Sequence, residues 1–168
     1  MKTIELCKLS SKYKIRKLDM NDVDMIYLFC RCNTQFYEYC GHENSIELIQ
    51  SDLKITPPGI PLEQKYYIGF FENDMLVAIM DLIDGYPDED CTYIGFFMMN
   101  KEIQGKGLGS SIISEALDYL KSIGFTSCRL AIDKDNPQSN HFWKKNGFEV
   151  IREIVRDEGT ILEAKRGL

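Results

Sequence analysis

The stretch from Gln104 to Gly109, QGKGLG, constrains the fold more than any other part of the chain. It separates an apolar run at residues 93–99 from an amphipathic run at residues 110–123, an order that predicts a strand, a tight glycine turn and a helix. Glycines at alternate positions leave a backbone without Cβ atoms and reach positive φ angles without strain. A helix beginning here would offer unpaired N–H groups at the positive end of its dipole. The turn is therefore a predicted anion site, for which phosphate is the usual ligand.

The spacing of the glycines excludes two common phosphate-binding motifs. A Walker A loop needs a different glycine spacing followed by Lys and Ser or Thr, and in the Rossmann fingerprint the third glycine would come one residue later than it does here. The spacing that fits is Gln-x-x-Gly-x-Gly, which resembles the signature of the GCN5-related N-acetyltransferases (GNAT). The resemblance implies that the turn holds the pyrophosphate of acetyl-coenzyme A, with six predicted cofactor-binding residues: Gln104, Gly105, Lys106, Gly107, Leu108 and Gly109. Two simpler interpretations stay open, a structural glycine turn and a solvated Lys106.

A second motif follows in the order that this family requires. Residues 136–148, NPQSNHFWKKNGF, are similar to the second GNAT motif, in which an Asn and a small residue precede an aromatic pair and Lys-x-Gly-Phe. The resemblance implies cofactor contacts from Asn136, Ser139 and Phe142. Asn136 is also a predicted helix cap, with proline at the first helical position, and the two roles compete for one side chain.

The resemblance, which extends from about residue 13 to residue 165, also implies where the chemistry takes place. In GNAT enzymes the fourth strand bulges and splays from the fifth, and its free backbone groups pair with the pantetheine arm; here Phe97 and Met99 match those positions. A glutamate on that strand often serves as the base, but Tyr93 stands at its position, and Asp81 on the neighbouring strand is a candidate substitute. A chain of water molecules is another candidate for the role of base. A tyrosine that often protonates the leaving thiolate is replaced by Trp143, whose indole N–H cannot act as an acid and whose simpler role is packing.

Composition and charge exclude several classes of function. The chain has 168 residues and a net charge of −6, with no cluster of Lys and Arg, which argues against nucleic acid as the main partner. We see no secretory signal and no apolar run long enough to span a membrane, so we expect no membrane partner and a cytoplasmic location. The six cysteines are expected to be reduced thiols. Cys30, Cys32, Cys40 and His42 could bind zinc in principle, but small, partly buried side chains are the simpler interpretation.

The expected fold is a single α/β domain spanning residues 1–168, with residues 1–11 as an N-terminal extension. The patterns predict the order β, α, α, β, β, β, α, β, α, β, β. The resemblance implies a GNAT-like, mostly antiparallel twisted sheet of six or seven strands with helices on both faces. Asp19 is a predicted cap of the first helix, Ser45 of a short second helix, and Gly124 ends the helix after the glycine turn. The secondary structure of residues 33–64 is the hardest to predict. The resemblance implies that this segment forms one wall of the acceptor pocket.

The leading hypothesis is an acetyl-CoA-dependent N-acetyltransferase acting on a primary amine of a small molecule or a peptide. Two alternatives remain: a CoA-binding sensor or scaffold that has lost transfer, and a nucleotide-binding domain of another family. No metal is expected in the reaction. The identity of the acceptor is beyond the sequence, and so is the oligomeric state, although many GNAT proteins form homodimers.

Overall fold

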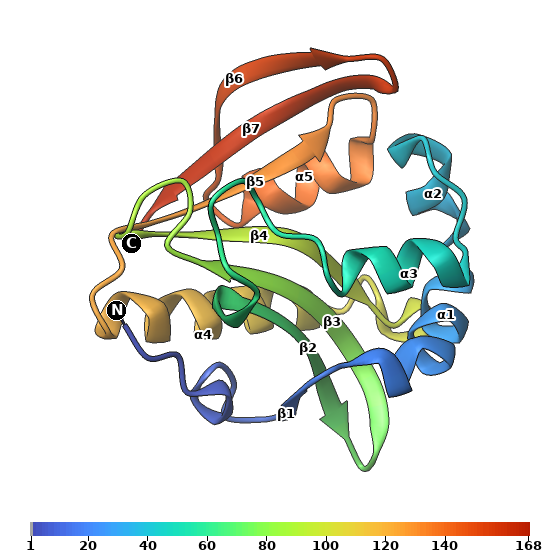
Figure 1. Cartoon of the computed structure of the whole chain (residues 1–168), viewed down its shortest axis with the longest axis horizontal. Coiled ribbons are helices and arrows are strands. Elements are labelled where there is room, and N and C mark those ends of the chain that lie inside the picture. The colour runs from blue at the N-terminus through green and yellow to red at the C-terminus, as the bar shows by residue number, and fades with distance from the viewer. Residues whose placement is uncertain (1) are drawn as a thin grey trace.

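A single seven-stranded sheet runs through the molecule, with strand order β1-β2-β3-β4-β5-β7-β6 (Figure 1). The computed structural model describes residues 2–168. Neighbouring strands are antiparallel except for β4 and β5, which are parallel. The strands are β1 (Lys14–Lys17), β2 (Lys65–Glu72), β3 (Met75–Asp84), β4 (Cys91–Met99), β5 (Ser127–Asp133), β6 (Glu149–Arg156) and β7 (Gly159–Gly167). The predicted mixed, mostly antiparallel sheet is confirmed.

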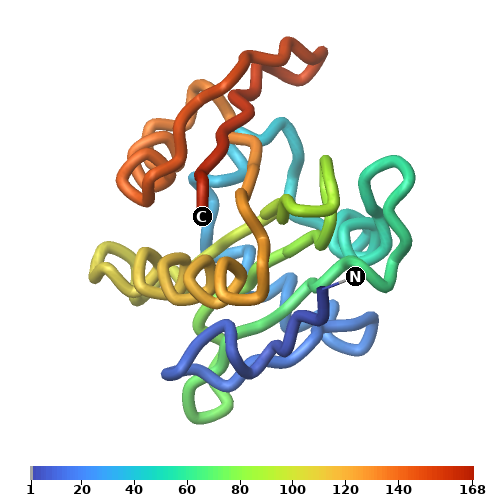
Figure 2. The backbone as a smooth tube through the Cα atoms, turned by 90° about the vertical axis from the view of Figure 1, so that its left-hand side faces the viewer, coloured from blue at the N-terminus to red at the C-terminus, as the bar shows by residue number. Residues whose placement is uncertain are grey.

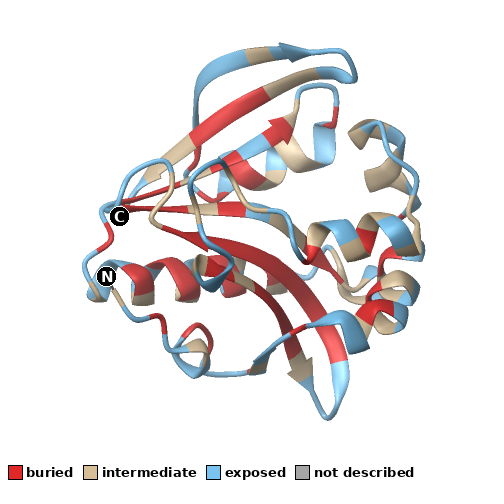
Figure 3. Ribbon diagram, in the orientation of Figure 1, coloured by how far each residue is buried: buried red, intermediate tan, exposed pale blue. Residues whose placement is uncertain are grey.

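Helices cover both faces of the sheet, as predicted (Figures 1 and 2). The helices are α1 (Val23–Arg31), α2 (Thr34–Cys40), α3 (Ile46–Asp52), α4 (Leu108–Ser122) and α5 (Pro137–Lys145). Two apolar clusters result: α4 and Trp143 of α5 pack on one face, and α1 and α3 pack on the other. Figure 3 shows the buried residues concentrated in the central strands and on the inner side of α4.

The predicted helix ends are confirmed by their hydrogen bonds. Asp19 forms a capping box with Asp22 in a 3-10 turn that leads directly into α1. The Ser45 side chain accepts a hydrogen bond from the Leu48 N–H at the start of α3. At the end of α4 the Phe125 N–H donates to Leu120 and the Gly124 N–H to Lys121, which is the paired pattern of a Schellman motif.

One helix was missed by the sequence patterns. Only two helices are predicted before β2, but the structure has three, because Thr34–Cys40 forms α2. This helix is seven residues long, its N-cap residue Asn33 makes no side-chain capping bond, and none of its residues is fully buried. A helix without a cap or a buried apolar stripe leaves little periodic signal in a sequence.

Residues 4–11 are packed against the sheet and α4. Residues Leu6–Lys8 form a 3-10 turn, and the flanking side chains of Ile4 and Leu9 are buried in the same cluster as α4. Glu115 of α4 fixes the next residues, since its carboxylate accepts hydrogen bonds from Ser10 and Ser11. The segment predicted as an extension therefore contributes to the core.

Strands β4 and β5 pair over only part of their length. Their register runs from Cys91 opposite Ser127 to Ile94 opposite Leu130 and does not continue beyond that pair. On the other side, the register of β4 with β3 shifts between Asp81 and Leu82, where Phe96 and Ile94 lie opposite and Gly95 is the extra residue. The structure therefore contains both the bulge and the splay that the resemblance implies for the fourth strand.

Candidate functional site

The free edge of β4 presents the backbone of Phe97 and Met99. In an antiparallel pair, hydrogen-bonded and non-bonded positions alternate. The Asn100 N–H donates to the Val77 carbonyl at 2.8 Å, so the groups of Asn100 and Met98 face β3, and those of Phe97 and Met99 face the opposite edge. That edge is the one from which β5 has diverged. Both predicted residues therefore offer backbone groups to the gap between the strands.

The glycine turn lies at the end of this gap and begins α4. Gly107 is the N-cap residue with φ of 78°, and Gly105 has φ of 76°, a region that disfavours any side chain. A Cβ atom built on either glycine would have no atom within 4 Å. The turn is thus an open cradle beside the first N–H groups of a 15-residue helix, as an anion site requires.

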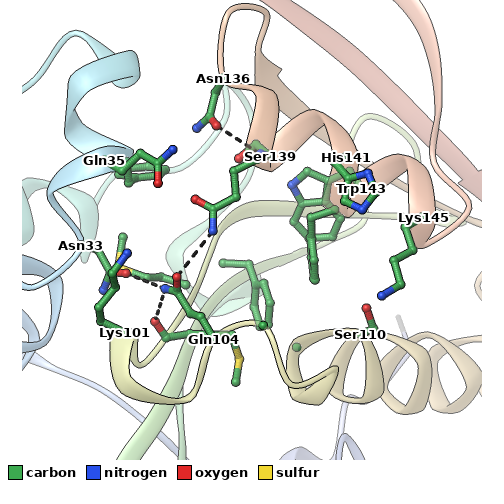
Figure 4. A pocket seen from close by; sticks show the side chains of 18 of the residues that line it. Asn33, Gln35, Lys101, Gln104, Ser110, Asn136, Ser139, His141, Trp143 and Lys145 are labelled. Carbon is green, nitrogen blue, oxygen red and sulfur yellow. Dashed lines mark hydrogen bonds between the residues drawn. The ribbon is translucent and has the colours of Figure 1, made fainter.

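Gln104 ties this turn to two other parts of the site. Its Nε2 donates to the Asn33 Oδ1 at 2.6 Å and to the Met99 carbonyl at 3.0 Å, while Nε2 of Gln138 lies 3.5 Å from its Oε1 (Figure 4). Asn33 is buried at the junction of α1 and α2. The side chain therefore fixes the turn to the end of β4 and to the helices that cover the other face.

A cavity of about 330 Å³ joins these elements. Nine of the predicted cofactor residues line it: Phe97, Met99, Gln104, Gly105, Gly107, Gly109, Asn136, Ser139 and Phe142. Two others, Lys106 and Leu108, lie in the same turn but are not part of the cavity wall. The wall also contains residues that sequence reasoning missed, among them Asn33, Gln35, Lys101, Ser110, Gln138 and Lys145. Gln138 lies inside the second motif and could have been found from its position, whereas nothing in the sequence pointed to Asn33.

The start of α5 closes the cavity on the side facing Gln104 (Figure 4). The Asn136 Oδ1 accepts a hydrogen bond from the Ser139 N–H at 3.1 Å, so Asn136 caps the helix as predicted. The cap uses the Oδ1 atom, and the residue lines the cavity as well. The two roles expected for Asn136 are therefore compatible.

Aromatic rings form the apolar wall. Phe142 stacks on Phe97 with ring centroids 5.8 Å apart, and Trp143 contacts Phe142, Phe97 and Phe148 at 4.9–6.0 Å. Gly109 allows this close packing, because a Cβ atom there would lie 3.2 Å from Met99 and 3.3 Å from Phe142. Trp143 is 7% exposed and packs in the core, as its simpler interpretation predicted.

Asp81 lies on β3 beside the bulge rather than in the cavity wall. Its Oδ2 accepts a hydrogen bond from the Lys65 Nζ at 2.5 Å, and Lys65 is buried. The same oxygen would lie 2.9 Å from a Cβ atom on Gly95, which is itself exposed. Burial raises the pKa of Asp81 to about 6, even though Lys65 favours the carboxylate. A buried carboxyl group with a raised pKa therefore lies beside the bulge of β4.

Tyr93 of β4 lies on the same face of the sheet as Asp81 and is half-buried. Its ring meets that of Tyr86 edge to face, with centroids 5.3 Å apart. Burial, followed by the nearby Glu163 carboxylate, raises the pKa of Tyr93 to about 12. The phenol thus stays neutral at physiological pH and is a poor base.

The described residues 2–168 contain no group of three or more His, Cys, Asp or Glu side chains arranged to hold a metal ion. Of the residues considered for zinc, Cys30 is buried, Cys32 is exposed and Cys40 is half-buried. Over the same part of the chain, no helix has the length and hydropathy needed to cross a bilayer.

Comparison with known proteins places the chain in a family. Residues 24–148 match the model of the acetyltransferase (GNAT) family. An acetyltransferase from Thermus thermophilus has a similar structure, with a TM-score of 0.71 at 18% identity, covering 94% of this chain and 97% of that one. The PaiA N-acetyltransferase from Thermoplasma acidophilum, solved with coenzyme A, gives 0.66 at 19% identity over 93% and 99%. AAC(6')-Ib, solved with paromomycin and acetyl-CoA, gives 0.71 at 14% identity over 94% of each chain. Since the family model matches most of the sequence, the chain belongs to the GNAT family of acetyltransferases.

Proposed function

We propose that this protein is an acetyl-CoA-dependent N-acetyltransferase that transfers the acetyl group directly to a primary amine of a small molecule or a peptide. The observation that carries this proposal is the continuity between the free edge of β4 and the glycine turn. The backbone of Phe97 and Met99, the turn and the start of α5 border a single cavity. An extended pantetheine arm needs backbone partners at one end, and a pyrophosphate needs N–H donors at the other.

Each part of the cavity has a role in this proposal. The N–H groups from Gln104 to Gly109 hold the pyrophosphate, and Lys106 adds positive charge at the rim. The backbone of Phe97 and Met99 pairs with the pantetheine and donates to the developing oxyanion. Asn136 and Ser139 contact the cofactor from α5, and the ring of Phe142 covers its apolar part. Holding both reactants in one gap supplies much of the rate enhancement.

Asp81 is the better of the two candidate bases. The amine is protonated at neutral pH and must lose a proton before its nitrogen attacks the thioester carbonyl, a step that breaks the C–S bond and releases the thiolate. The carboxyl of Asp81, with a pKa of about 6, accepts that proton directly or through water. Tyr93, whose pKa is raised to about 12, instead forms part of the floor on which the acceptor lies.

The leaving thiolate has no tyrosine to protonate it at the position of Trp143. A thiol with a pKa near 8.5 is a tolerable leaving group without an acid, so water can supply the proton. All six cysteines of the chain are free, which supports the proposed cytoplasmic location.

Thermal unfolding with and without acetyl-CoA tests the cofactor, with ATP and NAD as controls. Acetyl-CoA at 100 times its dissociation constant should stabilise the protein by about 2.7 kcal/mol, a shift of roughly 5–10 °C in the melting temperature. Thiol release with a panel of amines then tests transfer. A shift without thiol release would favour the CoA-binding sensor, and the absence of any shift would overturn the proposed site.

A further inference from the structure

A second cluster of charged side chains lies on the sheet beyond the gap in which the amine is proposed to react. Glu163 of β7 is buried and bridges two arginines: the Arg129 Nη1 donates to it at 3.2 Å, and the Arg152 Nε donates to its other oxygen. Burial alone would raise the pKa of Glu163, but the hydrogen bonds from the two guanidinium groups outweigh it and lower the pKa. This arginine–carboxylate cluster is fully ionised near neutral pH and carries one net positive charge.

The arginine–carboxylate cluster shares its face of the sheet with Asp81 and Tyr93. Alternate residues of a strand lie on the same face, and so do residues opposite each other on neighbouring strands. Tyr93 lies opposite Arg129, and Glu163 lies opposite both Ala131 and Arg152. The other face at these strands carries the apolar side chains that pack beneath α4 and α5. One surface therefore runs continuously from Asp81 across β4, β5 and β7 to Arg152.

The two ends of this surface have opposite charge. At the β3 end, two carboxylates, Asp81 and Asp52, surround one cation, Lys65. At the β6 end, two arginines share one carboxylate, that of Glu163. Two other pairs on this face have no net charge. Arg156 lies 3.9 Å from Asp133, and Glu149 lies opposite Lys165. A ligand lying across the strands would thus meet an acidic end and a basic end.

The arginines have hydrogen-bonding capacity that the protein does not use. A guanidinium has five N–H donors. The Arg129 Nε is buried without a hydrogen-bond partner among the described residues, and Arg152 is exposed on its outer side. The exposed N–H groups of Arg152 can donate to an anionic ligand oxygen, and hydrogen bonds between charged groups are the strong ones.

From this arrangement we infer that the acceptor carries an anionic group, a carboxylate being the simplest, which binds Arg129 and Arg152 while its amine lies on the exposed side of the bulge at Gly95, next to Asp81. This inference rests on the proposed acetyl transfer and specifies its acceptor class. Gly95 and Ala131 lie near the same level of the sheet, and Glu163 is two strand spacings from β4. At about 4.8 Å per spacing, and more where β4 and β5 have diverged, the amine and the anionic group are about 10 Å or more apart. The acceptor is therefore either an amino acid with a long spacer or a peptide α-amine followed by an acidic residue.

A series of ω-amino acids tests the inference by measuring the required separation. The amine acceptors are glycine, 4-aminobutanoate, 6-aminohexanoate and 8-aminooctanoate, each compared with the alkylamine of equal length and with 1,5-diaminopentane. We expect kcat/KM to favour the longer carboxylates over their alkylamines by about tenfold or more, since hydrogen bonds to charged groups commonly contribute that much. Two peptides, Ala-Ala-Asp-amide and Ala-Ala-Asn-amide, distinguish the peptide source from the free amino acid.

Variants locate the effect at the arginine–carboxylate cluster. Arg152→Gln changes an exposed side chain and should reduce the preference for carboxylates at least fivefold, with alkylamine turnover unchanged; Arg129→Gln should do the same where its melting temperature shows a folded protein. Lys134→Gln is the matched control, because Lys134 pairs with Glu153 at 3.0 Å on the opposite face of the hairpin. A preference that survives Arg152→Gln would overturn the assignment.

The same experiment separates failure of the inference from failure of the proposed function. Equal or faster turnover of alkylamines and diaminopentane would overturn the inference and leave the transferase intact. No thiol release with any amine, together with no thermal shift by acetyl-CoA, would overturn the transferase. If turnover is too slow to compare, the CoA-saturated protein is melted with N-acetyl-6-aminohexanoate or N-acetylhexylamine. Only the carboxylate should raise the melting temperature of the wild type, and an equal effect of both compounds would contradict the inference.

Discussion

The Gln104 side chain donates two hydrogen bonds through one nitrogen, to the Asn33 Oδ1 at 2.6 Å and to the Met99 carbonyl at 3.0 Å. The glycine turn is thereby attached both to the strand that is proposed to bind pantetheine and to the junction of α1 and α2. Asn33 lies 71 positions earlier in the chain. The first GNAT motif thus begins with a residue whose side chain connects the turn to β4 and to Asn33, while the backbone that follows it is proposed to bind the cofactor.

Replacing Gln104 should therefore weaken acetyl-CoA binding more than acceptor binding. Gln104→Ala leaves the partly buried Asn33 Oδ1 without a donor, and an unsatisfied buried group costs about 1–3 kcal/mol. We expect KM for acetyl-CoA to rise about 5- to 150-fold, with KM for the amine changed less than threefold. Steady-state kinetics with each substrate varied in turn measures both values. Lys106→Ala, in the same turn but outside the cavity wall, is the control and should have a smaller effect; equal effects of the two variants would contradict the role given to Gln104.

The bulge at Gly95 should tolerate no side chain. A Cβ atom there would lie 2.9 Å from the Asp81 Oδ2, which cannot move freely because Lys65 holds it. Gly95→Ala is expected to destabilise the protein by about 1–3 kcal/mol, the usual cost of overpacking, and to lower kcat. Gly167→Ala in β7 is the matched control, because no atom lies within 4 Å of its added Cβ. Urea unfolding measures both variants, and a neutral Gly95→Ala would show that the carboxylate is free to shift.

Local signals in the sequence predicted the parts of the fold that local physics determines. Asp19, Gly124 and Asn136 each act through hydrogen bonds to residues at most five positions away, so their residue type and spacing are sufficient. The glycine turn could be predicted for the same reason, since the positive φ angles of Gly105 and Gly107 depend on the residue type itself.

Contacts between distant segments lay beyond such signals. Lys65 and Asp81 are 16 residues apart, and no pattern indicates that they form a buried ion pair or that the pair borders Gly95. The bridge from Gln104 to Asn33 is equally invisible, because it depends on where α2 begins, and α2 has neither a cap bond nor a buried stripe. Most residues of the cavity wall could thus be predicted from motifs, whereas the surroundings of Asp81 depend on how the sheet brings distant residues together.

The pH dependence of kcat/KM tests Asp81 as the base. With Asp81 as the base, kcat/KM should fall about tenfold per pH unit below its pKa of about 6, because only the carboxylate accepts a proton. Protonation of Asp81 does not itself unfold the protein, so this fall in kcat/KM at low pH is not a loss of stability. Its pKa is higher in the folded than in the unfolded protein, so its ionisation lowers stability as pH rises from about 4 to 6, and acid relieves that cost.

Variants at both positions distinguish the candidates. Asp81→Asn should lower kcat by about 100-fold or more and abolish the inflection near pH 6. Tyr93→Phe should keep the wild-type kcat and the inflection near pH 6, since a phenol with a pKa of about 12 stays neutral over this pH range. Asp84→Asn controls for the loss of a buried carboxyl group on the same strand. Because Asp81→Asn leaves Lys65 buried without a counter-ion, its folding is checked by circular dichroism, and chemical rescue is attempted with formate. An unchanged pH profile in a folded Asp81→Asn protein would exclude Asp81 as the base.

Trp143 provides the last prediction, because it is the single tryptophan of the chain and lies in the cavity wall. Acetyl-CoA binding should change its fluorescence, and titration then yields a dissociation constant without any turnover. Trp143→Phe should retain kcat within about threefold, since an indole N–H cannot protonate a thiolate and the ring packs among Phe97, Phe142 and Phe148. Trp143→Ala should instead lose about 3–5 kcal/mol of stability, because it removes a buried ring. If Trp143→Phe is folded and binds acetyl-CoA but has lost turnover, the indole takes part in catalysis, and the conclusion that the thiolate leaves without a protein acid is wrong.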